Sequence, residues 1–147
     1  MDHLDHPSFE VWEERRRWVE NLAEPENAWG GYLISEQAAA LSADVQSAFC
    51  AGAWAAVIVL AAAVVDAQLR EDGHPGFKGN AKQLIDTVGC DGRFHALRKR
   101  RNALIHVDPD QPAITVDQQW TDRITLEHEA REAVTLMFET FYQSPLV

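Results

Sequence analysis

The chain has 147 residues, of which 46% are hydrophobic and 24% are charged, a balance typical of one folded domain rather than of a disordered chain. Its formal net charge of −10 argues against a protein that coats nucleic acid through bulk positive charge, but it is compatible with a local basic site. The first ten residues are acidic and polar, unlike a secretory signal. Cys50 and Cys90 lack metal-ligand spacing, so we expect a reduced, cytoplasmic protein.

The first half of the chain is expected to be helical. Residues 7–23 begin with proline, which is favoured in the first helical turn, and form the first predicted helix. Residues 24–35 contain a proline and a glycine pair and are typical of a linker. Ser35 is a plausible helix start, and the helical pattern then continues to about residue 72. Gly52 marks either a turn between two antiparallel helices or a bend in one.

The second half alternates loops and helices. Residues 73–80 form a loop, and residues 81–88 a short helix. Residues 92–107 form another helix, which an Asp-Pro pair ends. Residues 111–120 are expected to be irregular, or to include a short strand at residues 113–116. The last helix has a clear apolar spacing, and Thr125 is a suitable cap for it.

Helical structure over most of the chain predicts an all-α fold, an up-and-down bundle of four to five helices. We divide it into an N-terminal helix with its linker, residues 1–34, and a bundle, residues 35–147. No internal repeat is evident in the sequence.

Residues 48–65 form an uncharged run of 18 residues, which is close to the minimum length of a membrane-spanning helix. Eight of the 18 are alanine, Gly52 interrupts the run, and Asp44 and Asp66 flank it where lysine or arginine would be expected. We therefore expect a buried central helix and no membrane association.

A run of four basic residues, 98–101, stands out from this acidic chain. On a helix with about 100° per residue, Phe94, Leu97, Leu104 and Ile105 share one face, and Arg101 lies in the middle of it. An unpaired buried charge is very costly, so Arg101 must either pair with an acid or face a cleft.

Polar side chains flank Arg101 on this helix: His95, Arg98, Asn102 and His106. Asn102 and His106 are four residues apart, so their side chains are neighbours. A simpler explanation is that basic residues near a helix C-terminus interact with its macrodipole and stay solvated. That explanation suits Lys99 and Arg100 but not Arg101.

The segment RNALIH, residues 101–106, resembles the hallmark of the HEPN superfamily of small helical-bundle proteins. In that family an arginine, usually followed by a polar residue, precedes a histidine four to six positions further on. The apolar stretch 51–69 is similar to the long helix of these proteins, which often carries an acidic residue near its end; here Asp66 stands where glutamate is common. The resemblance covers roughly residues 35–143. It implies homodimers in which two motifs meet at one cleft.

The resemblance further implies a metal-independent endoribonuclease, without a cofactor, of a toxin or defence type. His106 would act as general base or acid on a ribose 2′-OH, and Arg101 would stabilise charge on the phosphate. Asn102 would orient His106 or contact the phosphate, and Asp66 would hold Arg101. Three further side chains are expected to bind RNA: His95, Arg98 and Lys99. The sequence offers no good metal site.

Two other interpretations stay open at this stage. The same bundle would serve as a non-catalytic module that binds RNA, a nucleotide or a partner protein. Alternatively, the chain would be a structural dimer in which Arg101 and Asp66 form a buried ion pair. An antitoxin or another regulatory protein is a further expected partner of the nuclease.

Overall fold

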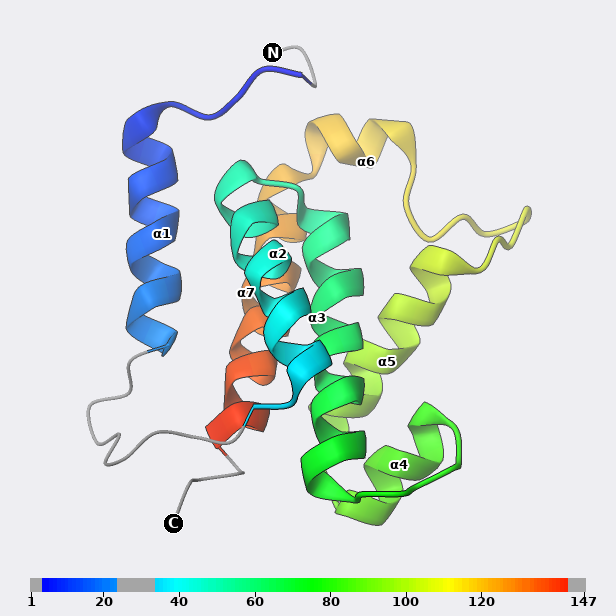
Figure 1. Cartoon of the computed structure of the whole chain (residues 1–147). Helices are drawn as coiled ribbons and strands as arrows, with labels where there is room; N and C mark the ends of the chain where they lie inside the picture. The colour runs from blue at the N-terminus through cyan, green and yellow to red at the C-terminus, as the bar shows by residue number, and fades with distance from the viewer. Residues whose placement is uncertain (1–3, 24–33, 143–147) are drawn as a thin grey trace.

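The structure is a computed structural model, which describes residues 4–23 and 34–142, with backbone alone for residues 72 and 73. The described residues form seven α-helices and one π-helical turn, and no strand (Figure 1). In chain order these are α1 (Phe9–Ala23), α2 (Glu36–Ala51), α3 (Trp54–Gln68), the π-turn η1 (Leu69–Gly73), α4 (Ala81–Val88), α5 (Gly92–Ile105), α6 (Val116–Thr121) and α7 (Arg123–Tyr142). The predicted all-α bundle is thereby confirmed.

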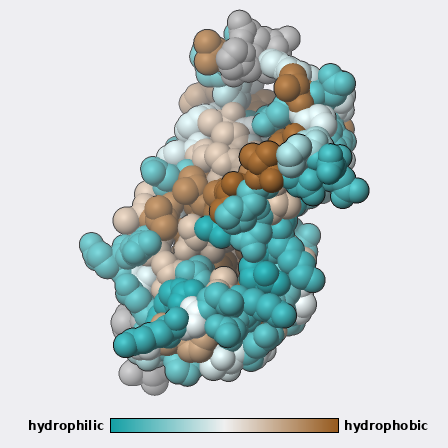
Figure 2. All heavy atoms as spheres, turned by 90° about the vertical axis from the view of Figure 1, so that its right-hand side faces the viewer, coloured by the Kyte–Doolittle hydropathy of each residue, from teal (hydrophilic) through white to brown (hydrophobic). Residues whose placement is uncertain are grey.

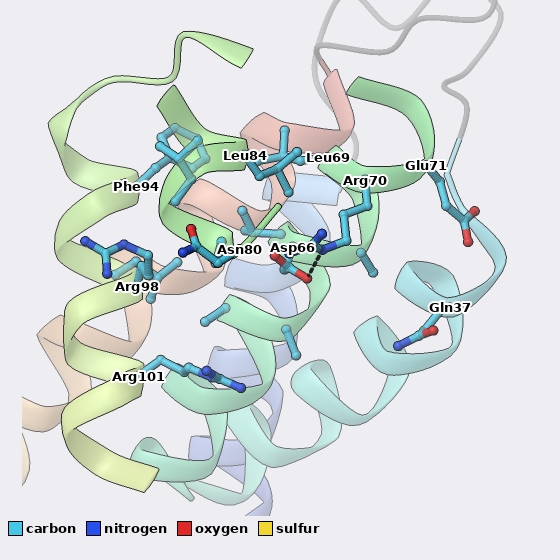
Figure 3. A pocket seen from close by; sticks show the side chains of 17 residues that line it. Gln37, Asp66, Leu69, Arg70, Glu71, Asn80, Leu84, Phe94, Arg98 and Arg101 are labelled. Atoms are coloured by element: carbon cyan, nitrogen blue, oxygen red, sulfur yellow. Dashed lines mark hydrogen bonds and ion pairs between the residues drawn. The ribbon is translucent and has the colours of Figure 1, made fainter. Parts of the chain in front are cut away.

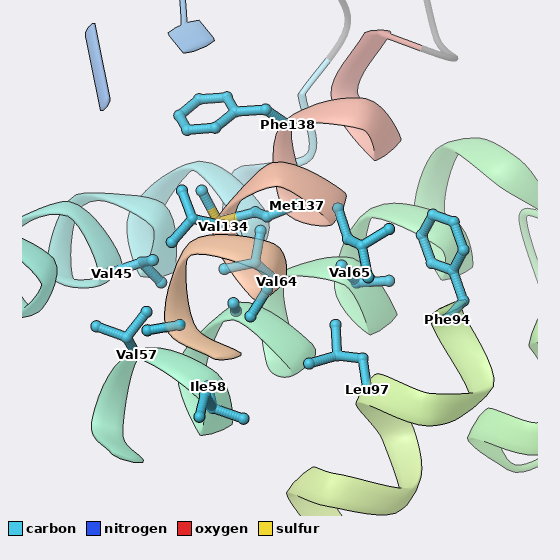
Figure 4. Packing of buried hydrophobic residues seen from close by; sticks show 14 of the residues in the cluster. Val45, Val57, Ile58, Val64, Val65, Phe94, Leu97, Val134, Met137 and Phe138 are labelled. Carbon is cyan, nitrogen blue, oxygen red and sulfur yellow. The ribbon is translucent and has the colours of Figure 1, made fainter. Parts of the chain in front are cut away.

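Helix α3 lies at the centre of the bundle and packs against α2, α5 and α7 (Figures 1 and 4). Its sequence is apolar on every side, and such a helix must be surrounded by other elements to leave water. Val57, Ile58, Val64 and Val65 of α3 are all buried in the core. The expected buried central helix is thus present. Within the described residues, no helix combines the length and apolarity needed to cross a membrane.

Gly52 lies in a turn between two separate helices, α2 and α3, and not at a bend within one helix. This residue has a positive φ of 79°, which glycine adopts without strain, and it ends α2. Helix α3 then returns along α2 as a separate antiparallel helix. Ser35 caps the start of α2, because its side chain accepts a hydrogen bond from the Ala38 amide, as the sequence predicts.

The helices α4 and α5 begin where the sequence predicts. Asn80 and Gln83 form a reciprocal capping box at the start of α4, and Gly89 ends it with a φ of 82°. Asp91 caps α5 by accepting from the Arg93 amide. Helix α5 ends at Ile105, two residues before the predicted end.

Three expectations about the elements differ from the structure. The bundle has more helices than four or five, because a capping box between Thr115 and Gln118 starts the short helix α6 where we expected irregular chain or a strand. Helix α7 begins at Arg123, so Thr125 lies inside it and does not cap it. Helix α1 begins at Phe9, after Pro7. Most of the predicted linker lies outside the described residues.

A cluster of arginines and aromatic rings fixes α1 to the bundle. Arg15 of α1 and Arg123 of α7 both lie over the ring of the buried Trp54, at 4.7 and 5.7 Å from its centroid. Arg131 of α7 lies 4.6 Å from the ring of Trp18, which itself stacks on the core residue Phe49. Cation–π contacts of this kind contribute about 0.5–2 kcal/mol each.

Candidate functional site

A cavity of about 530 Å³ lies between α3, η1, α4 and α5 (Figure 3). Apolar side chains from all four elements line it, among them Val65, Leu69, Leu84 and Phe94. Its polar lining residues are Gln37, Asp66, Arg70, Glu71, Asn80, Arg98 and Arg101. The cavity therefore joins an apolar wall to a group of charges, and two of these charges come from the basic run of α5.

Asp66 does line this cavity, but the structure does not pair it with Arg101. Its Oδ2 accepts a hydrogen bond of 2.8 Å from Nε of Arg70, one helical turn further on. Arg70 also donates to the carbonyl of Gly79, at 2.8 Å. The expected Asp66–Arg101 ion pair is therefore wrong, because a local partner at the i+4 position takes the carboxylate. The buried Oδ1 of Asp66 has no hydrogen-bond partner among the described residues.

Arg101 faces the cavity rather than an acidic partner. It is half-buried, and in Figure 3 it extends from α5 towards α3. Its Nη1 donates to Oδ1 of Asn102 at 2.9 Å. The described residues form no salt bridge with it. The sequence allows Arg101 either to pair with an acidic residue or to face a cleft, and in the structure it faces a cleft.

Asn102 and His106 lie where α5 ends. The amide oxygen of Asn102 holds Arg101, so the structure does not use it to orient His106. His106 is the C-cap of α5, with extended backbone angles of φ −109° and ψ 121°, and its amide donates to the Asn102 carbonyl. Its side chain is exposed and does not line the cavity. Within one chain, Arg101 therefore lines the cavity and His106 does not.

The remaining basic residues of α5 have different environments. Arg98 lines the cavity, and its buried Nε has no hydrogen-bond partner among the described residues. Lys99 is exposed. Arg100 is half-buried, unlike our expectation of a solvated side chain, and donates to the Ala113 carbonyl and to Glu129 of α7. His95 lies 2.8 Å from a carboxylate oxygen of Asp86, so RNA would have to compete with that contact.

The apolar stripe of α5 is shorter than the sequence pattern indicates. Phe94 and Leu97 are buried, and Leu104 packs partly against the core, but Ile105 is 42% exposed. The next apolar residue, Val107, is 91% exposed. Figure 2 shows an apolar band that crosses this side of the molecule between hydrophilic regions. The end of α5 therefore presents apolar side chains to solvent beside His106.

Two lining residues escaped the sequence interpretation, and each has a signal in the sequence. Arg70 stands four residues after Asp66, which is the spacing of a helical ion pair. Asn80 precedes an amphipathic helix and has Gln83 three residues later, the pattern of a capping box. Arg70 lies in the π-turn η1 that follows α3, and π-helical turns are frequent at functional sites.

The described residues contain no group of three or more His, Cys, Asp or Glu side chains placed to hold a metal ion. Burial raises the pKa of the Cys50 and Cys90 thiols, and both are therefore protonated near neutral pH and poorly nucleophilic. Comparison with family models, curated proteins and solved structures gives no match for this chain. The interpretation of the site therefore rests on its own geometry.

Proposed function

We propose that this protein is a metal-independent endoribonuclease of the HEPN type, which acts as a homodimer and cleaves RNA through attack by a ribose 2′-OH. The observation that supports this best is the state of Arg101. It occupies a core position of α5, yet the described residues give it no carboxylate partner, and its guanidinium lies in a cavity. Keeping such a charge half-buried is unfavourable unless a bound anion completes its interactions.

The proposed reaction uses His106 and Arg101. The neutral imidazole of His106 takes the proton from a ribose 2′-OH, and the 2′-oxygen attacks the adjacent phosphorus. The bond from phosphorus to the 5′-oxygen of the next nucleotide breaks, and that oxygen takes up a proton. The products are a 2′,3′-cyclic phosphate and a 5′-hydroxyl end. Arg101 stabilises the charge that develops on the phosphoryl oxygens, through two parallel N–H donors.

A dimer would supply what one chain lacks. His106 is exposed, whereas Arg101 faces the cavity, so a site with both groups requires a second surface. Ile105 and Val107 flank His106 in the direction of solvent, and exposed apolar groups gathered on one face favour contact with another chain. We propose that two copies meet at the ends of their α5 helices. Arg98 and Lys99 would then extend the positive surface along the bound RNA.

The wider role that we propose is that of a toxin or defence-type nuclease in the cytoplasm, held in check by an antitoxin or another regulatory protein. A nuclease with an exposed catalytic histidine needs such control. A protein that covers the exposed end of α5 would block access to His106.

Incubation of the purified protein with mixed RNA in the presence of EDTA tests this proposal. We expect cleavage that leaves 2′,3′-cyclic phosphate ends, and we expect His106→Ala to abolish it. His128→Ala is the matched control, since His128 is an exposed histidine of α7 and should leave cleavage unchanged. Circular dichroism should show the same helical content and melting for all three proteins.

Two results would contradict the proposal in different ways. Wild-type protein that leaves RNA intact in every condition would favour a non-catalytic binding module. Cleavage that disappears in EDTA and returns with added divalent metal would retain the nuclease but exclude the metal-independent mechanism.

A further inference from the structure

The loop that follows His106, residues 107–112, is exposed along its whole length. Figure 1 shows this part of the chain, between α5 and α6, extending away from the helices. Inside the loop, the Asp110 amide donates to the Asp108 side chain at 3.1 Å. The chain returns to the bundle at Ile114, which packs partly against the core. The loop is therefore attached to the bundle at its two ends, and His106 stands at the first of them.

Arg100 fixes the second end of the loop. Its Nη1 donates to the Ala113 carbonyl at 2.9 Å, and its Nη2 donates to Oε2 of Glu129 in α7 at 3.2 Å. Among the described residues, no other side chain from outside the segment 107–113 forms a hydrogen bond with it. Hydrogen bonds from a charged donor are stronger than those between neutral groups. One guanidinium therefore joins α5, α7 and the end of the loop.

The position of Arg100 next to Arg101 matters for the proposed site. Successive residues of a helix point about 100° apart. Arg101 accordingly faces the cavity, while Arg100 reaches α7 from another side of α5. The bond from Arg100 to Ala113 closes a ring of chain that contains Arg101 and His106. Movement of this ring would change the position of His106 relative to Arg101.

A second arginine of α5 shows what an ion pair with α7 requires by itself. Arg93 donates to both carboxylate oxygens of Glu139, at 3.1 and 2.8 Å, and makes no described contact with the loop. Its side chain is 46% exposed, whereas that of Arg100 is 29% exposed. Helix α5 is thus tied to α7 without Arg100. The contribution that only Arg100 makes is its hydrogen bond to the Ala113 carbonyl.

We propose that Arg100 is a positioning residue, which holds the loop 107–112 and thereby sets the place of His106 in the catalytic site. Its guanidinium binds protein groups, so it acts through the backbone and not through contact with RNA. Without this bond the chain after His106 would move more freely, and the histidine would be in place for proton transfer less often. The effect on cleavage rests on the proposed nuclease function, whereas the fixing of the loop does not.

Amide order parameters from ¹⁵N relaxation test the fixing of the loop without RNA. In the wild type, the non-proline amides of residues 107–113 should stay above about 0.6, and in Arg100→Met they should fall below it, into the range of a flexible backbone. Arg93→Met is the matched control, because it removes an ion pair between α5 and α7 but no contact with the loop. It should leave these order parameters at their wild-type values. Circular dichroism checks that both variants keep the helical content of the wild type.

RNA cleavage tests the positioning of His106. With a fluorogenic RNA that the wild type cleaves, Arg100→Met should lower kcat about tenfold or more and change KM less than about twofold, because the loss concerns the chemical step. Arg93→Met should cleave at the wild-type rate. Glu129→Gln leaves Arg100 and its bond to Ala113 in place, so kcat should fall less than about threefold. Arg100→Lys should regain part of kcat, since a lysine lacks the planar fork that reaches both partners at once.

Three results would overturn the proposal. Order parameters in the loop that are the same in Arg100→Met and in the wild type would show that Arg100 does not hold it. An equal loss of kcat in Arg100→Met and Arg93→Met would assign the effect to the docking of α5 on α7. A higher KM with unchanged kcat would make Arg100 a residue that binds RNA.

Failure of the nuclease proposal gives a different pattern. If the wild type leaves RNA intact, the role of Arg100 in placing a catalytic histidine fails with it. The order parameters then decide alone whether Arg100 holds the loop. Arg100→Gln replaces Arg100→Met if circular dichroism shows that the latter fails to fold.

Discussion

Two groups of arginines in this molecule differ in their surroundings. At the turn between α2 and α3, Arg15 donates to the Cys50 carbonyl and Arg123 to the Gly52 carbonyl, and both lie over Trp54. In the cavity, Arg98 and Arg101 have no acidic partner among the described residues. Burial of an arginine therefore does not by itself mark a functional site. A functional site is better indicated by a buried hydrogen-bond donor that has no acceptor within the fold.

The environment of Arg15 illustrates the structural use of a buried cation. Burial lowers the pKa of Arg15, as do Arg123 and Arg131, while Glu127 raises it. The guanidinium nevertheless keeps its charge, because the pKa of arginine starts so high. The Cys50 carbonyl accepts a hydrogen bond from the guanidinium, and the indole ring of Trp54 lies against its positively charged face. Arg101 has a single hydrogen bond, to Asn102, and this leaves most of its donors for a ligand.

The largest difference between the two groups of arginines is expected in the rate of RNA cleavage. The variant that tests it is Arg101→Lys. Lysine keeps the charge but lacks the planar pair of donors, so the cleavage rate should fall about 100-fold or more. The melting temperature should stay close to that of the wild type, because the described fold does not depend on a partner of Arg101. The comparison variant is Arg123→Lys, which should cleave RNA at the wild-type rate. Equal loss of activity in both variants would remove the distinction between the groups.

At the turn between α2 and α3, a substitution is expected to lower stability and to leave activity unchanged. Arg15→Met removes the hydrogen bond to Cys50 and the contact with Trp54, and it should lower the free energy of unfolding by about 1–2 kcal/mol. RNA cleavage should be unchanged in the folded protein. Urea unfolding, followed by circular dichroism, measures the loss. Unaltered stability together with reduced cleavage would show that α1 takes part in function rather than in the fold.

The helices that the sequence predicted best are those with local signals at both ends. Asn80 and Gly89 bound α4, and Asp91 starts α5, because capping depends on residues a few positions apart. Helix α6 was missed since Val116 and Trp120 are largely exposed, so the segment has no apolar periodicity to reveal a helix.

The candidate site was predicted less completely than the helices. The helical wheel placed Arg101 on the inner face of its helix, which agrees with its position in the cavity. The wheel could not show that the core ends before Ile105, because that depends on which elements cover the last turn of α5. For the same reason the position of His106 in solvent did not follow from its spacing to Arg101. The cavity itself depends on how α3, α4 and α5 meet, and no local pattern encodes that.

The smallest predicted effect concerns Asp66, for which sequence and structure name different partners. A double-mutant cycle with Asp66→Asn and Arg70→Met should give a coupling energy of about 0.5 kcal/mol, since both side chains are about one-third exposed and such pairs are weak. The cycle of Asp66→Asn with Arg101→Met should be additive within error. The free energies of unfolding of the single and double variants measure both couplings. Strong coupling between Asp66 and Arg101, with none to Arg70, would restore the ion pair that the sequence suggests. Arg101 would then have an acidic partner within the fold, and it would belong with the structural arginines at Trp54.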